Sequence, residues 1–274
     1  MPRKASPGEA WVSPKPRNGG LRIAVAYPNS LRVGMSNLGY QAILRAFLEE
    51  PGFDARRVFW NGRSLEFPDG GRSLSDFAVV AFSVSYQPDL VHLPRMLEAA
   101  RGALVIGGGA ALTINPETSA GFFDLIVLGD SEPVLPRLME TLLSVGAEKD
   151  RILEIMEGTQ GAYFPSRYRG KGPVPRHTRA VFQNLDQFPA RPAVICREAE
   201  FGGIYPLEVS RGCPAGCLFC AAGAVCGPVR FLGMDAFRSE SELGLRYRKK
   251  IGLVGTAVSY HPKLTEMARF LLGE

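Results

Sequence analysis

The sequence has 274 residues, 46% of them hydrophobic and 22% charged, and a formal net charge of +5 at pH 7. This length suits one large domain or two ordinary ones, and the composition excludes fibrous and broadly disordered proteins. Most of the excess charge lies within residues 1–22, where five basic side chains oppose only Glu9, so the charge does not by itself indicate nucleic-acid binding.

Residues 1–20 are rich in proline, glycine and basic residues, and they predict a flexible leader. This stretch has no apolar core of the kind found in secretory signals, and no apolar run approaches the ~20 residues that cross a bilayer. Four of the five cysteines cluster within residues 213–226 instead of forming separated pairs, which favours a reducing compartment. We expect a cytoplasmic protein without a membrane partner.

Residues 21–146 alternate short apolar strands with amphipathic helices. The expected strands lie at residues 21–27, 55–60, 77–85, 103–109 and 124–130, and the expected helices at 35–50, 90–100 and 132–144. This alternation implies a parallel sheet covered by helices on both faces. Five such strands in about 125 residues fit an α/β, flavodoxin-like doubly wound sheet.

Ligands of such sheets bind at the carboxyl ends of the strands. Glycines at this edge would let the backbone approach a bulky ligand, although they could equally form only tight strand-to-helix turns. The candidate binding residues are Ser83, Ser85, Gly107, Gly108, Gly109, Thr113, Asp130, Ser131 and Glu132. Neither a G-x-G-x-x-G after the first strand nor a P-loop motif is present, which argues against a Rossmann dinucleotide site and a P-loop.

Residues 147–200 predict a connector, because proline, glycine and arginine are frequent over 158–194 and no helical period is sustained there. Basic runs at 167–179 and 246–250 are expected to be solvated. His177 in the connector and His92 in the first unit are interpreted as surface residues and not as ligands.

Cys213, Cys217 and Cys220 form a C-x3-C-x2-C motif in a loop that follows the apolar strand "IYPLEV". Three thiolates on so short a loop can reach one metal centre. A structural zinc site would need a fourth ligand, which Cys226 could supply only with awkward spacing. An iron–sulfur cluster with three thiolate ligands would leave one iron open to a substrate or cofactor. Cys196 and Cys226 are each interpreted as small buried side chains.

The segment "CPAGCLFC" resembles the cluster-binding loop of radical S-adenosylmethionine (radical SAM) enzymes, with Phe219 before the last cysteine. The segments "YPNSLRVGMSNLGYQAIL", "FSVSY", "VIGGGAALTINPE" and "LIVLGDSEP" are similar to the cobalamin-binding domain that precedes the barrel in one subgroup. The resemblance covers roughly residues 21–265. It divides the chain into a leader (1–20), a cobalamin-binding-like domain (21–146), a connector (147–200) and the start of a (β/α) radical SAM barrel (201–274).

The resemblance implies that Cys213, Cys217 and Cys220 hold a 4Fe–4S cluster, shielded by Phe219. S-adenosylmethionine would bind the fourth iron and be cleaved reductively to a 5′-deoxyadenosyl radical, for methyl transfer or rearrangement at an unactivated carbon. Cobalamin would bind at the glycine-rich edge. Gly255 and Thr256 occupy the place where many family members contact S-adenosylmethionine. No histidine follows the first strand, so a cobalt-ligating histidine is not expected there.

Only about two barrel units follow the cysteine loop, so we expect a fragment whose barrel a second chain could complete. The expected partners are an unidentified substrate and an electron donor such as a flavodoxin or ferredoxin. Two alternatives remain open: a radical SAM protein that does not use cobalamin, and a non-catalytic, zinc-stabilised binding module whose basic connector touches nucleic acid.

Overall fold

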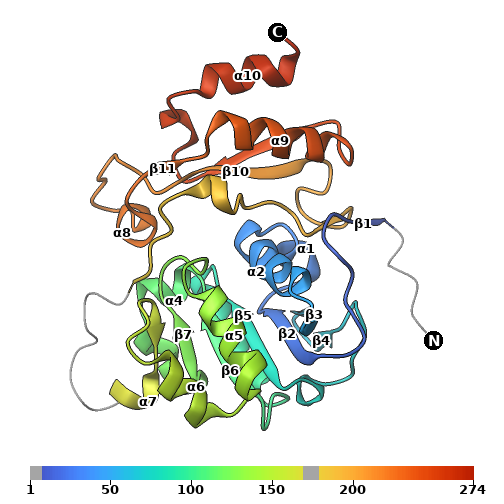
Figure 1. Cartoon of the computed structure of the whole chain (residues 1–274), viewed down its shortest axis with the longest axis vertical. Coiled ribbons are helices and arrows are strands. Elements are labelled where there is room, and N and C mark those ends of the chain that lie inside the picture. The colour runs from blue at the N-terminus through green and yellow to red at the C-terminus, as the bar shows by residue number, and fades with distance from the viewer. Residues whose placement is uncertain (1–7, 169–178) are drawn as a thin grey trace.

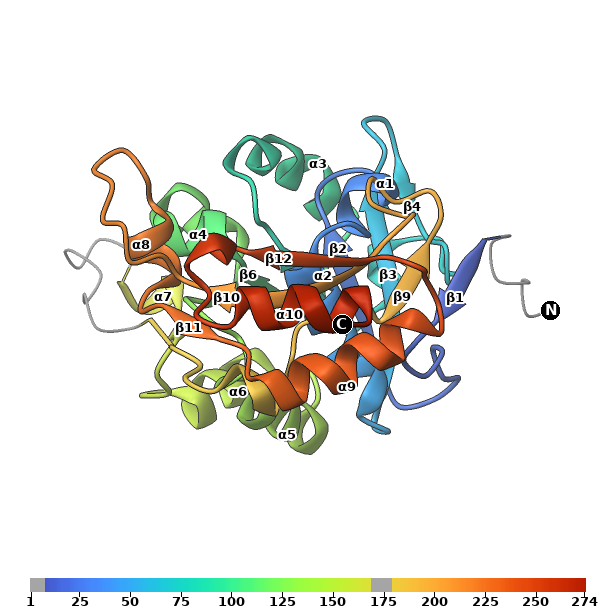
Figure 2. The ribbon, with the colours of Figure 1, turned by 90° about the horizontal axis from the view of Figure 1, so that it is seen from above.

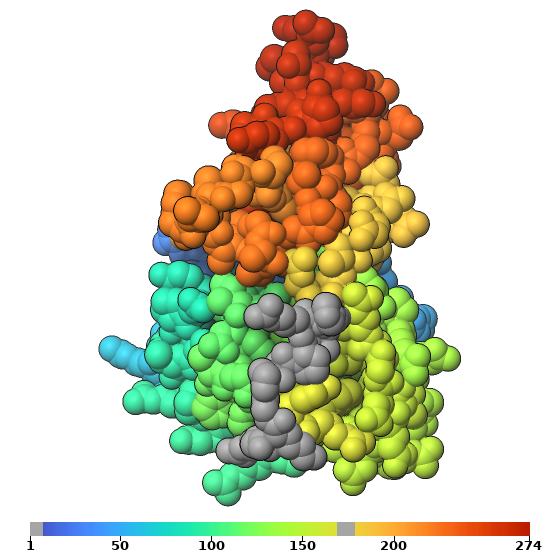
Figure 3. All heavy atoms as spheres, turned by 90° about the vertical axis from the view of Figure 1, so that its left-hand side faces the viewer, coloured from blue at the N-terminus to red at the C-terminus, as the bar shows by residue number. Residues whose placement is uncertain are grey.

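The computed structural model describes residues 8–168 and 179–274 of the chain. A large α/β layer at the bottom carries a smaller α/β layer at the top (Figure 1). In the space-filling view, the orange and red part after about residue 200 sits directly on the larger part (Figure 3). His177 lies outside the described residues.

The large sheet contains seven strands in the order β4-β3-β2-β5-β6-β7-β8. The five strands from β3 to β7 run parallel, and the edge strands β4 and β8 are antiparallel to their neighbours. In chain order, the parallel strands lie 2-1-3-4-5 across the sheet. The strands are β2 Leu21–Tyr27, β3 Phe53–Trp60, β4 Leu65–Glu66, β5 Val79–Ser83, β6 Leu104–Gly108, β7 Leu125–Val127 and β8 Ala162–Tyr163.

All five strands expected from the sequence are therefore confirmed. Central strands of a parallel sheet are covered on both faces, so they read as nearly continuous apolar runs. The stretch Ile23–Tyr27 of β2 is buried at every residue. The expected strand over 77–85 is longer than β5, because the chain leaves the sheet after Ser83.

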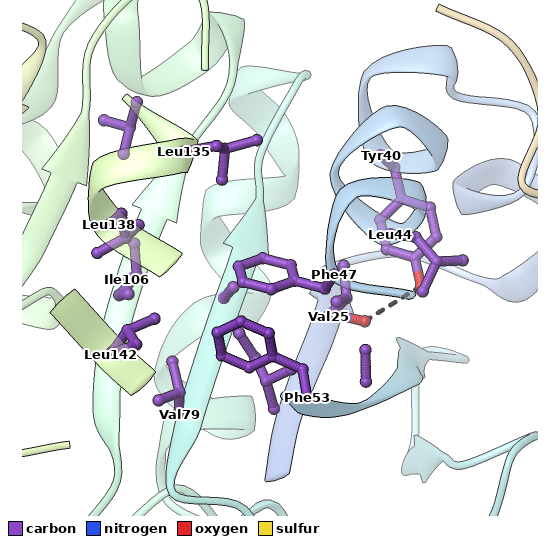
Figure 4. Close-up of a cluster of buried hydrophobic side chains, with 14 of the residues drawn as sticks. Val25, Tyr40, Leu44, Phe47, Phe53, Val79, Ile106, Leu135, Leu138 and Leu142 are labelled. Atoms are coloured by element: carbon purple, nitrogen blue, oxygen red, sulfur yellow. Dashed lines mark hydrogen bonds between the residues drawn. The ribbon is translucent and has the colours of Figure 1, made fainter. Parts of the chain in front are cut away.

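Helices cover both faces of this sheet. One face carries α2 (Leu38–Glu49), α5 (Leu135–Val145) and α6 (Lys149–Met156), and the aromatic and aliphatic side chains between them and the sheet form the main core (Figure 4). In this core the Tyr40 hydroxyl donates a hydrogen bond to the Val25 carbonyl oxygen at 3.1 Å. The other face is covered by α3 (Leu93–Leu97), α4 (Ala110–Ile114) and the 3-10 segments η1 (Leu74–Asp76), η2 (Gln87–His92) and η3 (Pro116–Phe122).

The helix expected over 35–50 begins only at Leu38, as α2, and a separate short helix, α1 (Leu31–Gly34), precedes it. The start of α2 is fixed by Asn37, whose side chain accepts a hydrogen bond from the Tyr40 amide at 2.8 Å. The helix expected over 90–100 is partly 3-10, in η2, and becomes α-helical only in α3.

The prediction of a flexible leader is wrong at residues 9–13. Strand β1 (Glu9–Trp11) pairs antiparallel with β9 (Val194–Cys196). The Glu9 carboxylate is buried against Arg57, with an O–N distance of 2.7 Å, and Asp69 contacts the same guanidinium at 2.6 Å. The connector is equally well defined where it is described, with α6, β8, α7 (Pro165–Tyr168), η4 (Leu185–Gln187) and β9.

The upper layer is a three-stranded sheet in the order β11-β10-β12, with β10 and β12 parallel. From above, α9 and α10 lie beside these strands, and α8 lies next to α4 of the large layer (Figure 2). The elements are β10 Tyr205–Arg211, α8 Ala222–Cys226, β11 Arg230–Phe231, α9 Met234–Leu245, β12 Ile251–Gly255, η5 Val258–Tyr260 and α10 Leu264–Leu272. In the described ranges, no helix has the length and apolar character needed to span a bilayer.

Candidate functional site

A cavity of about 370 Å³ lies between the two layers, at the carboxyl ends of β5, β6 and β7. Its roof comes from the upper layer, through Glu208 and Arg211 of β10, Cys226 of α8 and Thr256 after β12. All the binding residues expected from the sequence except Gly255 line it: Ser83, Ser85, Gly107, Gly108, Gly109, Thr113, Asp130, Ser131, Glu132 and Thr256.

One wall of the cavity is apolar and belongs to the helices on the core face. Leu38, Ile43 and Phe47 come from α2, and Leu135 and Leu138 come from α5. The cavity therefore combines an apolar side with a polar rim, which is the usual character of a small-molecule site.

The three rim glycines have different physical reasons to be glycine. A Cβ on Gly107 would lie 2.7 Å from Leu112 Cδ1 and 2.8 Å from the Phe123 ring, so packing beneath the strand excludes it. Gly109 has φ +109°, and a Cβ at this position would clash with the backbone of Val84. A Cβ on Gly108 would make only ordinary contacts, the nearest at 3.7 Å from the Val127 oxygen. Neither packing nor backbone conformation therefore accounts for the glycine at position 108.

Thr113 has a structural role at this edge. Its hydroxyl donates to the Gly109 carbonyl oxygen and accepts a hydrogen bond from the Gly129 amide, each at 3.0 Å. It therefore ties the loop after β6 to the loop after β7. Ser131 begins the next turn, since its carbonyl oxygen accepts from the amides of Val134 and Leu135.

The two carboxylates of the rim are occupied by ion pairs. Arg211, a residue that sequence reasoning missed, approaches Asp130 at 3.0 Å and Glu132 at 2.8 Å, and its third partner is Glu208 at 2.7 Å. Burial acts to lower the pKa of Arg211, but the carboxylates of Glu208 and Glu132 outweigh it and the pKa is raised. Arg211 therefore stays charged, and it offsets part of the negative charge of Asp130, Glu132 and Glu208.

The cysteine loop follows β10 directly. Cys213 is half-buried, whereas Cys217 and Cys220 are exposed, and the Cys220 amide donates to the Cys217 carbonyl oxygen at 3.1 Å. Within residues 8–168 and 179–274, no three His, Cys, Asp or Glu side chains are close enough together to hold a metal ion. The structure therefore does not bring the three thiols of Cys213, Cys217 and Cys220 together, although the donor set fits a three-thiolate cluster in its chemistry and two of the cysteines are exposed.

Phe219, which was expected to shield the cluster, lies on the surface of the loop in this structure. Its side chain is 92% exposed, and Leu218 beside it is fully exposed. Cys226, expected to be a small buried side chain, is half-buried and lines the cavity roof. Burial, together with the nearby Asp130 carboxylate, raises the pKa of its thiol. Cys196 is buried as expected.

Gly255 lies against β10 and does not line the cavity. A Cβ at this position would lie 2.6 Å from the Ser210 carbonyl oxygen, so the close approach of β12 to β10 explains the glycine. The neighbouring Thr256 does reach the cavity. His92 is half-buried, with its ring 6.3 Å from that of Trp60, and it does not line the cavity.

Residues 42–165 match the family described as radical SAM proteins, N-terminal. Over 258 residues the chain is 24% identical to an uncharacterised protein of Methanocaldococcus jannaschii, a match that covers 91% of this chain and 52% of that protein. It is 31% identical over 160 residues to the hopanoid C-3 methylase of Methylococcus capsulatus, covering 53% of this chain and 28% of the methylase.

Two solved structures of TsrM, a radical S-adenosylmethionine methyltransferase of Kitasatospora setae, share this fold with a TM-score of 0.61 at 17% identity. One contains cobalamin and a [4Fe-4S] cluster, and the match covers 93% of this chain and 50% of TsrM. The other contains tryptophan and an analogue of S-adenosylmethionine, with 92% and 50% covered. The chain spans at most about half the length of these relatives. Over residues 42–165, the chain is similar to the N-terminal region of radical SAM proteins.

Proposed function

We propose that this chain contributes the cobalamin-binding and cluster-binding part of a radical SAM enzyme that transfers a methyl group or rearranges an unactivated carbon. Residues 21–146 would form a flavodoxin-like cobalamin-binding domain, which the 2-1-3-4-5 strand order supports. Residues 201–274 would begin the (β/α) barrel, since β10 and β12 are parallel and a helix follows each.

The observation that carries this proposal is the position of the cysteine loop relative to the cavity. Arg211 just before the loop and Cys226 at its end both line the same cavity as Ser83 and Gly108 of the large sheet. The two ends of the cysteine loop therefore border the cavity, whereas Cys213, Cys217 and Cys220 themselves do not line it. A cluster on the loop would lie next to the space that receives a cofactor at the strand ends, and such proximity is what chemistry shared between two cofactors needs.

Cys213, Cys217 and Cys220 would hold the cluster, which supplies one-electron reduction of S-adenosylmethionine at its open iron. Thr256 and the roof residues of β10 would position that cosubstrate. Gly108 and the apolar wall of α2 and α5 would receive cobalamin. The cavity of about 370 Å³ has room for a side arm of cobalamin and not for the whole corrin. An electron donor and a second segment or chain that extends the barrel beyond β12 would complete the system in the cytoplasm.

The test is anaerobic reconstitution of the chain with iron and sulfide, compared with Cys217→Ala and Cys196→Ala. The parent chain and Cys196→Ala are expected to become brown and to hold equal amounts of iron and sulfide. Cys217→Ala should lose nearly all of its iron, because three ligands leave none to spare. Since Cys217 is exposed, this loss cannot be attributed to a disrupted core.

A chain that stays colourless while it retains stoichiometric zinc would refute the proposal and favour the zinc-stabilised module. Iron binding without any retained cobalamin would leave the radical SAM part of the proposal standing and remove the cobalamin part.

A further inference from the structure

The loop that carries the cysteine motif is bracketed by two arginines. Residues 212–229 lie between Arg211, the last residue of β10, and Arg230, the first residue of β11. Both side chains are largely buried, with 13% and 6% exposed. Both extend across the layer boundary to the large sheet, where they reach the same carboxylate.

That carboxylate is Asp130, which follows β7. Its Oδ1 lies 3.0 Å from Arg211 Nη1, and its Oδ2 lies 2.5 Å from Arg230 Nη1. Glu132 and Glu208 contact Arg211 alone. Asp130 is therefore the acceptor that joins the two ends of the cysteine loop.

Asp130 is itself held firmly. Its amide donates to the Ala180 carbonyl oxygen at 3.0 Å, and its Oδ2 accepts from the Phe182 amide at 2.8 Å. The adjacent Gly129 forms a parallel bridge with Ala180. The position of the Asp130 carboxylate is thus fixed by the end of β7 and by the connector, independently of its contacts with the two arginines.

Arginine side chains also hold the end of the loop near α8. Arg230 donates to the Cys226 carbonyl oxygen, and Arg179 donates to the carbonyl oxygens of Val225 and Gly227 at 2.5 and 2.8 Å. The tip at Cys217–Cys220 has no such support and is exposed. The stem of the loop is therefore fixed to the large sheet, while its thiol-bearing tip remains open.

We propose that Asp130 is a positioning residue, which holds the cysteine loop above the cavity through Arg211 and Arg230. This role rests on the proposed function and replaces the direct cofactor contact that the sequence predicted for Asp130. Loss of the carboxylate charge would leave two buried guanidinium groups competing for the remaining acceptors, and the stem of the loop would loosen.

The test compares Asp130→Asn, Asp130→Glu and a control, Glu266→Gln, which breaks the exposed ion pair of Arg238 and Glu266 away from the loop. The first readout is amide hydrogen exchange of the chain without iron. In Asp130→Asn, exchange over residues 222–230 should be roughly tenfold faster or more, the size expected for loss of one charge-assisted hydrogen bond. Asp130→Glu should restore much of the protection, and the control should leave it unchanged.

The second readout is the electron paramagnetic resonance spectrum and iron content of the reduced, reconstituted proteins. A displaced loop should change the spectrum or lower the iron content of Asp130→Asn but not of Asp130→Glu. Unchanged exchange over 222–230 together with an unchanged spectrum in Asp130→Asn would overturn the proposal. If Asp130→Asn fails to fold, Arg230→Lys tests the same contact, because lysine keeps the charge and loses the planar fork. If the parent chain binds no iron, the proposed function fails, and the exchange comparison still decides the role of Asp130.

Discussion

Four of the five cysteines lie in two contrasting environments, and Cys213 is intermediate between them. Cys217 and Cys220 are exposed at the tip of their loop, whereas Cys196 is buried in the core and Cys226 faces the cavity. Burial is the main cause that raises the pKa of both Cys196 and Cys226. The thiolate is the reactive form of cysteine. Burial limits reagent access to Cys196 and Cys226 and also raises the pKa of their thiols, so both effects lower their reactivity.

We predict that iodoacetamide modifies Cys217 and Cys220 of the iron-free chain well before Cys196 and Cys226 at pH 8. The delay at Cys226 should shrink as the pH rises, because a raised pKa keeps the thiol protonated to higher pH. Peptide mass spectrometry at several times and pH values measures the order. Equal rates for Cys226 and Cys217 at pH 8 would contradict the cavity environment described for Cys226.

The ion pairs of the acidic rim residues could not be predicted from the sequence. The position of Asp130 and Glu132 after a strand correctly placed them at the cavity. Their partners lie on β10 and β11, far along the chain, and no local pattern links the two segments. The glycine run had a similar outcome, since packing explains Gly107 and Gly109 but not Gly108.

At the scale of elements, α2 illustrates why the main features were predictable. The spacing of the side chains predicted one buried face made by Leu38, Ala42, Leu44, Phe47 and Leu48. The last four are buried, whereas Leu38 is half-buried and lines the cavity. The same helix also buries Gln41, at 2% exposure, which hydrophobic periodicity alone would not place in the core. Strands of two or three residues, such as β1, β4 and β8, are too short to give a recognisable alternation.

Gln41 joins α2 to the connector. Its Nε2 donates to the carbonyl oxygens of Met35 and Val194, and its Oε1 accepts from the amides of Ala193 and Val194, all within 2.9–3.2 Å. We predict that Gln41→Leu lowers the free energy of unfolding by about 1–3 kcal/mol, because buried backbone groups lose their hydrogen-bond partners.

Urea unfolding followed by circular dichroism measures this change. The control is Gln187→Leu, at an exposed position, which should stay within about 0.5 kcal/mol of the parent. A Gln41→Leu protein as stable as the parent would mean that β9 is not anchored to α2 through this side chain.

At the scale of the whole molecule, the cavity exists only because the two layers meet. The large sheet provides its floor and apolar wall, and the small sheet provides Arg211, Cys226 and Thr256. The order of the elements could be predicted, because each buried strand appears in the sequence as a short apolar run. The contact between the layers could not, because it depends on long-range ion pairs and on a connector of irregular structure.

Gly108 offers a test of the floor of this cavity. We predict that Gly108→Leu weakens cobalamin retention on gel filtration by roughly tenfold, since the added side chain would enter the cavity. Iron content after reconstitution should be unchanged. The matched control is Gly121→Leu, where nothing lies within 4 Å of an added Cβ. Equal retention of the corrin absorbance by both variants would remove Gly108 from the binding surface.

The pairing of β1 with β9 joins two segments that are synthesised at very different times. Glu9–Trp11 leaves the ribosome early, yet its partner Val194–Cys196 is synthesised nearly two hundred residues later. The β1–β9 pair is separate from the large sheet, and it can form only after the connector has been made. An excised segment that ends at residue 146 would keep Glu9 and Arg57 but lose the strand that pairs with β1 beside them.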